Sequence, residues 1–214
     1  MQRMAHPDGE CANARAAARM GTVFTLSTIA TSSIEQISSI EGLHFFQLYI
    51  YKDSITQLPI VLKGVLTPEA AIKGVNSGAA AIWVSNHGAR QIDTVSSTTT
   101  ILYQNIDVLP EIVAAVGNKC EVFIDGGFRT GTDVYKALAL GAKMVFLGRP
   151  LIWGLACGGE EGAYQVLNIM KTELESTMIN SGNILFIIHM KSGTLPVTDI
   201  YQELQYPMDI ISKL

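Results

Sequence analysis

The sequence contains few cysteines and no recognisable pairing among them, which excludes two classes of protein. The three cysteines, Cys11, Cys120 and Cys157, are scattered and show neither CxxC nor Cys/His spacing. A disulfide framework and a metal site both require such spacing, so neither is expected. We therefore expect reduced thiols in a reducing or intracellular setting.

Long apolar runs and basic clusters are also absent. The stretch ILFIIHM at 184–190 is far shorter than the roughly 18 residues of a membrane helix. The first six residues lack the apolar core of a signal peptide. A net charge of −4 without a Lys/Arg run argues against a nucleic-acid partner. We expect a soluble protein without a membrane span.

The chain instead has enough apolar side chain for one large folded domain. Of its 214 residues, 48% are hydrophobic and 16% are charged, which disfavours general disorder. Apolar runs alternate with amphipathic segments along most of the length. Strands are predicted at 22–28, 44–52, 58–65, 79–88, 120–127 and 142–150, and helices at 8–21, 32–40, 67–78, 108–118, 130–141 and 160–178.

This alternation is typical of βα units and predicts an α/β fold with a parallel sheet. The strands are nearly continuous apolar runs, as expected where helices cover them. Helix 67–78 shows the start signals most clearly, because Thr67 can cap it, Pro68 suits its first position and Glu69 suits its positive end.

Polar residues recur in or after the carboxyl halves of the predicted strands. Each alone fits ordinary turn chemistry, but in parallel α/β folds this edge carries the active site, so together they predict one shared site. The residues are Ser27, Gln47, Tyr49, Lys63, Ser85, His87, Asp125, Gly126, Gly127, Gly148 and Arg149.

The segment VSNHGARQID at 84–93 concentrates the most reactive groups. A plain turn after the strand needs only Asn86 and Gly88, yet His87 and Arg90 are present too. An imidazole beside a guanidinium indicates a loop that handles an anionic substrate.

Two further turns suit a phosphate group. DGGFRTG at 125–131 combines two glycines with Arg129 and a helix start, and LGRP at 147–150 combines Gly148 with Arg149. Exposed amides and helix N-termini bind phosphate, and barrels of the TIM type hold it after their last two strands.

The segments MQRMAHPDGECANARAA, FFQLYIYKD, LPIVLKGV, VSNHGARQID and VFIDGGFRTGTDVYKALALGAKMVFLGRPLIWGLA resemble the FMN-dependent 2-hydroxy acid oxidases, the glycolate oxidase group. The resemblance covers residues 1–53 and 56–182 and its motifs are long and specific. It implies a (β/α)₈ barrel that binds FMN. It also implies oxidation of a small 2-hydroxy acid to a 2-oxo acid, with molecular oxygen giving hydrogen peroxide.

On the substrate side, the resemblance implies that His87 is the catalytic base and that Arg90 clamps the substrate carboxylate. Asp125 is expected beside His87, where it stabilises the imidazolium, and Tyr49 is expected to hydrogen-bond the substrate. Lys63 is expected near the flavin, where its charge stabilises the reduced ring.

On the cofactor side, the resemblance implies two groups of residues besides Lys63. Ser27, Gln47 and Ser85 are expected to hydrogen-bond the flavin ring, with Asp125 and Gly126 close by. Gly127, Arg129, Gly148 and Arg149 are expected to hold the phosphate.

The chain also departs from the family pattern. It begins after the place of the first barrel strand, and a block containing another strand is missing near residues 53–56. We therefore predict an incomplete barrel with about six of its eight strands. The segment 94–105 is longer than the family's connection, and Ile29 stands where a tryptophan is common. Residues 183–214 form a divergent tail, so residues 1–182 are the predicted partial barrel.

The tail ends in Ser212-Lys213-Leu214, a peroxisomal address, so we expect recognition by the import receptor and peroxisomal localisation. The family also implies a homo-oligomer. Two alternatives to an active oxidase stay open. One is an inactive truncated chain that binds flavin weakly or only associates with full-length subunits. The other is a different phosphate-binding barrel, which Cys120 disfavours because it opens a strand rather than a catalytic loop.

Overall fold

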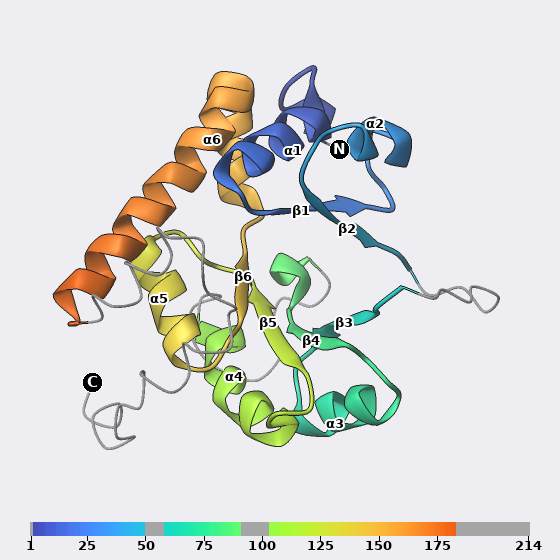
Figure 1. Ribbon diagram of the computed structural model, residues 1–214, viewed down its shortest axis with the longest axis vertical. Coiled ribbons are helices and arrows are strands. Elements are labelled where there is room, and N and C mark those ends of the chain that lie inside the picture. The colour runs from blue at the N-terminus through green and yellow to red at the C-terminus, as the bar shows by residue number, and fades with distance from the viewer. Residues whose placement is uncertain (1, 50–57, 91–102, 183–214) are drawn as a thin grey trace. The chain divides into compact units, whose positions relative to one another are not determined.

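The computed structural model describes residues 2–49, 58–90 and 103–182, and within residues 103–105 it describes only the backbone (Figure 1). The chain divides into two compact units. The first comprises residues 1–59 and 147–172, and the second comprises residues 60–146 and 173–214. Each unit is a parallel α/β assembly in its own right.

The first unit is built on two parallel strands, β1 (Val23–Ser27) and β2 (Leu43–Gln47). Their register pairs Val23 with Leu43 and ends with Ser27 beside Gln47. The helical elements of this unit are η1 (Gln2–Met4), α1 (Gly9–Met20), α2 (Ile34–Ser38) and the first part of α6 (Arg149–Asn180).

The core of the first unit lies between these strands and α1 and α2. Phe24 and Leu26 of β1 pack with Ala14 and Ala17 of α1 and with Ile37 of α2. The small alanine side chains allow the helix to approach the strand closely.

The second unit contains a four-stranded parallel sheet in the order β3, β4, β5, β6. Consecutive parallel strands joined by right-handed crossovers place their connecting helices on one face of a sheet, and Figure 1 shows this arrangement for α3, α4 and α5. The elements are β3 (Val61–Val65), α3 (Pro68–Asn76), β4 (Ala81–Val84), η2 (His87–Ala89), α4 (Tyr103–Val116), β5 (Glu121–Asp125), α5 (Gly131–Ala139) and β6 (Met144–Phe146).

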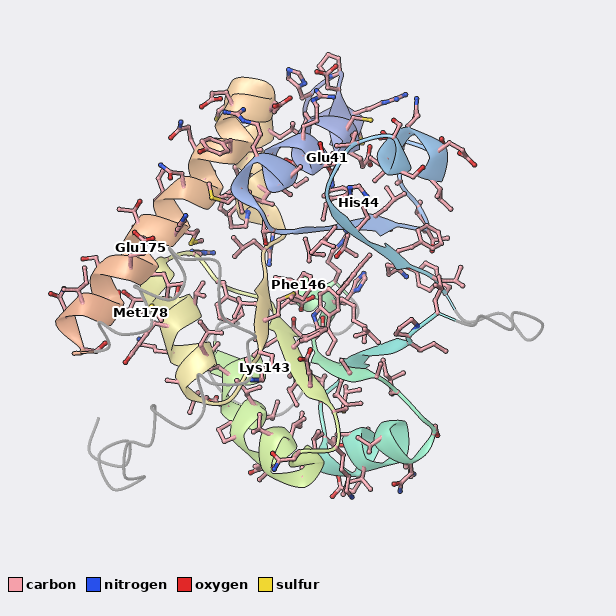
Figure 2. The ribbon with its side chains drawn as sticks, viewed as in Figure 1. Glu41, His44, Lys143, Phe146, Glu175 and Met178 are labelled. Carbon is pink, nitrogen blue, oxygen red and sulfur yellow. The ribbon has the colours of Figure 1, made fainter. Side chains whose placement is uncertain are left out.

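The two faces of this sheet differ in what covers them. On the helix face, Gly74 of α3 lies so close to Leu62 and Ile82 that an added Cβ would stand 2.7 and 2.8 Å from their side chains. On the opposite face, Trp83 stacks on Phe146, which Figure 2 labels, with 3.8 Å between the ring centroids. Because side chains alternate along a strand, Ser85, which directly follows β4, is expected on the same face as Trp83.

The predicted order of strands and helices is confirmed, and the caps assigned to helix 67–78 are confirmed too. Thr67 accepts a hydrogen bond from the Ala70 amide at 3.2 Å, and Pro68 begins the helix. The strand predicted at 79–88 is shorter, because β4 ends at Val84 and His87 and Gly88 belong to η2.

The boundaries near residue 150 were predicted wrongly. The strand placed at 142–150 ends at Phe146, and α6 begins at Arg149 rather than at residue 160. Pro150 explains the early start, because its fixed φ suits the first turn of a helix. Gly158 and Gly159 have non-helical backbone angles that separate two helical segments, and the second one matches the predicted helix.

Contacts within the first unit hold the second segment of α6 against α1. Arg15 donates to Glu160 at 2.5 Å, and Arg19 pairs with Glu161 at 3.0 Å. Within the described ranges, no helix is long and apolar enough to cross a membrane, and no group of three or more His, Cys, Asp or Glu side chains could hold a metal ion.

Candidate functional site

Three adjacent strands of the second unit bring a lysine, a serine and an aspartate together. Lys63 belongs to β3, Ser85 directly follows β4, and Asp125 ends β5. The ammonium of Lys63 lies 2.8 Å from Asp125 Oδ2 and donates to Ser85 Oγ at 2.6 Å. Ser85 Oγ in turn donates to Asp125 Oδ1 at 2.5 Å. We call these three residues the polar triangle.

The polar triangle is largely withdrawn from water. The side chain of Lys63 is 26% exposed and that of Asp125 is 18% exposed, while Ser85 is 2% exposed. The ammonium also lies 5.1 Å from the centre of the Trp83 ring, within the range of a cation–π interaction. The opposite charges of lysine and aspartate compensate each other, so the low exposure is tolerated.

His87 follows the polar triangle on a turn with unusual backbone geometry. His87, Gly88 and Ala89 have φ values of 58°, 66° and 60°. The left-handed region is unfavourable for residues with a Cβ, so His87 and Ala89 each cost about 1–2 kcal/mol. Such strain persists only where surrounding contacts enforce it, and it is concentrated at functional sites.

Two side chains close this left-handed turn. The His87 amide donates to Ser85 Oγ at 3.0 Å, and the Ala89 amide donates to the Asn86 side-chain oxygen at 3.3 Å. Asn86 was predicted only as a turn residue, and the structure gives it this capping role. The sequence signal was present, because asparagine side chains readily hydrogen-bond amides a few residues on.

The surroundings of His87 favour its neutral form. Partial burial lowers the pKa of the imidazole below 6.5, and the positive charges of Lys63 and Arg90 lower it further, while Asp125 opposes them. Arg90 directly follows the turn and is exposed. A neutral imidazole beside an exposed guanidinium can accept a proton from a molecule whose anionic group the guanidinium binds.

The glycine turn after β5 has the conformation expected of a phosphate loop, but the amides that follow it are bonded to protein carboxylates. Gly126 and Gly127 have φ values of 96° and 84°, which only glycine adopts readily. At the following helix start, Asp133 accepts from the amides of Arg129 and Thr130 at 3.1 and 3.0 Å. Glu173 accepts from the Gly131 amide at 2.7 Å. The amides of residues 129–131, at and just before the start of α5, therefore bind protein carboxylates.

The first unit has a polar group of its own, at the ends of β1 and β2. Ser27 Oγ donates to Gln47 Oε1 at 3.2 Å, and the Thr28 amide donates to the same oxygen at 3.4 Å. With its oxygen accepting two hydrogen bonds, the Gln47 side chain is oriented so that its NH₂ group remains a donor.

The predicted site residues thus fall into two sets. Lys63, Ser85, His87 and Asp125 come together in the second unit. The first unit contains Ser27, Gln47, half-exposed Tyr49, and the turn at Gly148 and Arg149, where Arg149 opens α6. The described part of the predicted insertion at 94–105 is helical, since α4 begins at Tyr103, and the rest lies outside the described residues.

Comparison with a family model gives a match over nearly all of the described chain. The model for FMN-dependent dehydrogenases matches residues 1–56 and 53–184. Its two matched segments therefore meet where the sequence predicts a missing block.

Curated relatives agree with this match. Glycolate oxidase 1 of Oryza sativa subsp. indica is 38% identical over 270 residues, covering 85% of this chain and 71% of the relative. 2-Hydroxyacid oxidase 1 of Homo sapiens is 38% identical over 274 residues, covering 85% and 72%. Both alignments are longer than this 214-residue chain, so the relatives carry segments without a counterpart in it.

Solved structures of mandelate oxidase show the same architecture. A variant with a monooxide FMN adduct superposes with a TM-score of 0.76 at 35% identity, covering 83% of this chain and 71% of that one. The enzyme with benzoyl-formic acid gives 0.76 at 34% identity, covering 83% and 70%. The predicted incomplete (β/α)₈ barrel and the predicted family resemblance are thereby confirmed.

Proposed function

Because this chain belongs to the FMN-dependent dehydrogenase family, we propose that it oxidises 2-hydroxy acids to 2-oxo acids and delivers the electrons to molecular oxygen. Relatives named as oxidases of glycolate, 2-hydroxy acids and mandelate support this reaction class. The observation that carries the proposal for this chain is the left-handed turn that holds His87 and Arg90 next to the polar triangle, and the lowered pKa of His87 supports it.

The donors within each unit are of the kinds that FMN requires. Lys63 uses two of its three N–H groups on Ser85 and Asp125, which leaves one for a flavin carbonyl. Gln47 offers its NH₂ group as a second ring donor. Gly126, Gly127, Arg129, Gly148 and Arg149 supply glycine turns and guanidinium groups suited to the phosphate.

When bound, FMN supplies the two-electron acceptor, which molecular oxygen reoxidises to give hydrogen peroxide. The substrate loses two electrons and two protons, one from its carbon and one from its hydroxyl. Arg90 binds the substrate carboxylate through its planar fork, and Tyr49 hydrogen-bonds the substrate. One imidazole nitrogen of His87 accepts a proton as the C–O bond of the substrate becomes a carbonyl.

Asp125 has a double role in this proposal. Its direct contacts are with Lys63 and Ser85, and its charge stabilises the protonated form of His87. The Lys63–Asp125 pair is close to neutral overall, so the charge that Lys63 directs at reduced flavin is moderated. Asp125 thereby partly offsets the positive charges of Lys63 and Arg90, which lower the pKa of His87.

The test begins with the full chain, incubated with FMN and separated from free flavin by gel filtration. We expect a flavin absorbance band in the protein peak, bleached anaerobically by glycolate or (S)-mandelate, with hydrogen peroxide formed when oxygen is readmitted. His87→Gln should retain the flavin and lose the bleaching, whereas the matched control His6→Gln should retain both.

The other outcomes separate the alternatives. Flavin that stays bound but is never bleached would favour the inactive chain that associates with full-length subunits. A colourless protein peak would refute FMN binding by this chain.

Three further expectations stay predictions. Ser212, Lys213 and Leu214 lie outside the described residues, so peroxisomal import rests on the sequence. The boundary between residues 182 and 183 coincides with the end of the described residues, although the family match ends nearby at residue 184. We also propose a homo-oligomer, which sedimentation of the flavin-loaded chain tests.

A further inference from the structure

We propose that Ser85 is a positioning residue, which joins the Lys63–Asp125 ion pair to the left-handed turn that carries His87. The sequence resemblance implies a hydrogen bond from Ser85 to the flavin, and the positioning role is separate from it. The structural part of the proposal stands on the contacts of Ser85 alone, and its consequence for turnover rests on the proposed function.

The Ser85 hydroxyl uses its full hydrogen-bonding capacity. A serine hydroxyl has one proton and two lone pairs. Ser85 Oγ donates its proton to Asp125 and accepts from Lys63 Nζ and from the His87 amide. The hydroxyl thereby joins the side chains of Lys63 and Asp125 to the backbone of His87.

Ser85 is also buried. At 2% exposure it is withdrawn from solvent, unlike His87 and Arg90, which are exposed. Buried polar groups with complete hydrogen bonding rigidify their surroundings. Ser85 is therefore suited to fix the geometry of the residues that it contacts.

The turn that carries His87 depends on Ser85 for a hydrogen-bond acceptor. His87 is a non-glycine residue with φ of 58°, and its amide points at Ser85 Oγ at 3.0 Å. Without this acceptor the amide loses its partner, and the turn can relax toward ordinary backbone angles. His87 would then move from its place among Lys63 of β3, Asp125 of β5 and Arg90 of its own turn.

The experiment follows the titration of the imidazoles by NMR in full-length chain labelled at its four histidines. The His87 signal is identified by its absence in His87→Gln. In Ser85→Ala we expect the pKa of His87 to rise toward its ordinary value, because the relaxed turn exposes the imidazole to water and moves it away from Lys63, which together outweigh the loss of the Asp125 charge. Ser85→Thr restores the hydroxyl and should restore the titration, while the matched control Ser38→Ala, an exposed serine of α2, should leave it unchanged.

Ser85→Cys gives a second test if Ser85→Ala does not fold. The thiol has nearly the size of the hydroxyl but is a weak donor and acceptor, so the same displacement of the His87 titration is expected. An unchanged titration of His87 in a folded Ser85→Ala or Ser85→Cys chain would overturn the proposal.

Turnover is measured separately with flavin-loaded chain. Positioned proton transfer contributes about 10²–10⁴-fold to rate, so kcat should fall at least about tenfold in Ser85→Ala while KM changes little. An altered titration in a chain whose wild type oxidises no 2-hydroxy acid would refute the proposed function and leave the role of Ser85 intact. Normal turnover with an unaltered titration would refute the role of Ser85 alone.

Discussion

Glu10 offers the sharpest test of how this chain stabilises its first unit. The carboxylate is 3% exposed on α1 and accepts hydrogen bonds from the Thr31 amide at 3.0 Å, the Thr31 hydroxyl at 2.5 Å and the Ser32 hydroxyl at 3.3 Å. The Gln2 amide donates to it at 3.3 Å. It thereby ties the loop between β1 and α2 to the N-terminal helix.

The expected magnitude follows from the pKa of this carboxyl. Burial by itself raises the pKa of Glu10, but the hydrogen bonds, those from Thr31 foremost, lower it from 4.5 to about 2. At 1.36 kcal/mol per unit, the ionised form contributes about 3 kcal/mol to folding. Because the folded-state pKa is depressed, this stability is present above about pH 4.5 and is lost as the pH falls toward 2.

The variant is Glu10→Gln, which keeps the shape of the side chain and one acceptor oxygen. Its NH₂ group replaces the other oxygen and faces the donors of Thr31 or Ser32, to which it cannot bond. We expect a loss of about 2–3 kcal/mol in the free energy of unfolding at pH 7, measured by urea denaturation. The difference from wild type should shrink steadily between pH 4.5 and pH 3.

The matched control is Glu41→Gln, an exposed glutamate of the same unit that Figure 2 labels. It should change stability by no more than about 0.5 kcal/mol. If Glu10→Gln were as mild as this control, or if its effect were the same at pH 7 and pH 3, the hydrogen-bonded carboxylate would not stabilise the fold as argued.

Three further predictions concern His87, Asp125 and the chain terminus. Because the folded-state pKa of His87 is lowered, its neutral form favours folding above about pH 6.5. When the pH is lowered from 8 to 5.5, the melting temperature of the wild type should therefore fall further than that of His87→Gln. Equal decreases would contradict the lowered pKa. Asp125→Asn leaves the ammonium of Lys63 unpaired and should cost about 2–4 kcal/mol in urea denaturation, less than a fully buried pair because both side chains keep some exposure. A double-mutant cycle with Lys63→Met checks that cost, and a coupling near zero would refute it. Leu214→Glu should keep a fluorescently tagged chain in the cytosol, and unchanged peroxisomal import would refute the address.

Much of the architecture was readable in the sequence because its signals are local. The alternation of apolar runs with amphipathic segments predicted the six described strands and their order with the longer helices, since burial on one or both faces imposes a period on the chain. It did not predict η1, η2 or the first segment of α6. Thr67 with Pro68 predicted a helix start for the same reason, because a cap and a fixed φ act within one turn. Where local signals competed, at Pro150 and the Gly158–Gly159 pair, the boundary was misplaced.

The site was readable only as a set of residues. Lys63, Ser85 and Asp125 are separated by 22 and 40 positions, and their position at strand ends predicted a common edge. Which atoms bind one another was not readable. Hydrogen-bond partners across strands depend on register and side-chain direction, and no local pattern specifies these.

The sequence by itself determined the α/β class and the family, and it named the residues proposed for catalysis. These follow from composition, period and motifs. Only the tertiary structure decided that Ser85 is saturated by its neighbours, that His87 stands on a left-handed turn among opposing charges, and that Glu10 is a buried ionised clamp. The physical reason is that desolvation, hydrogen-bond saturation and Coulomb interaction depend on distances between residues far apart in the chain.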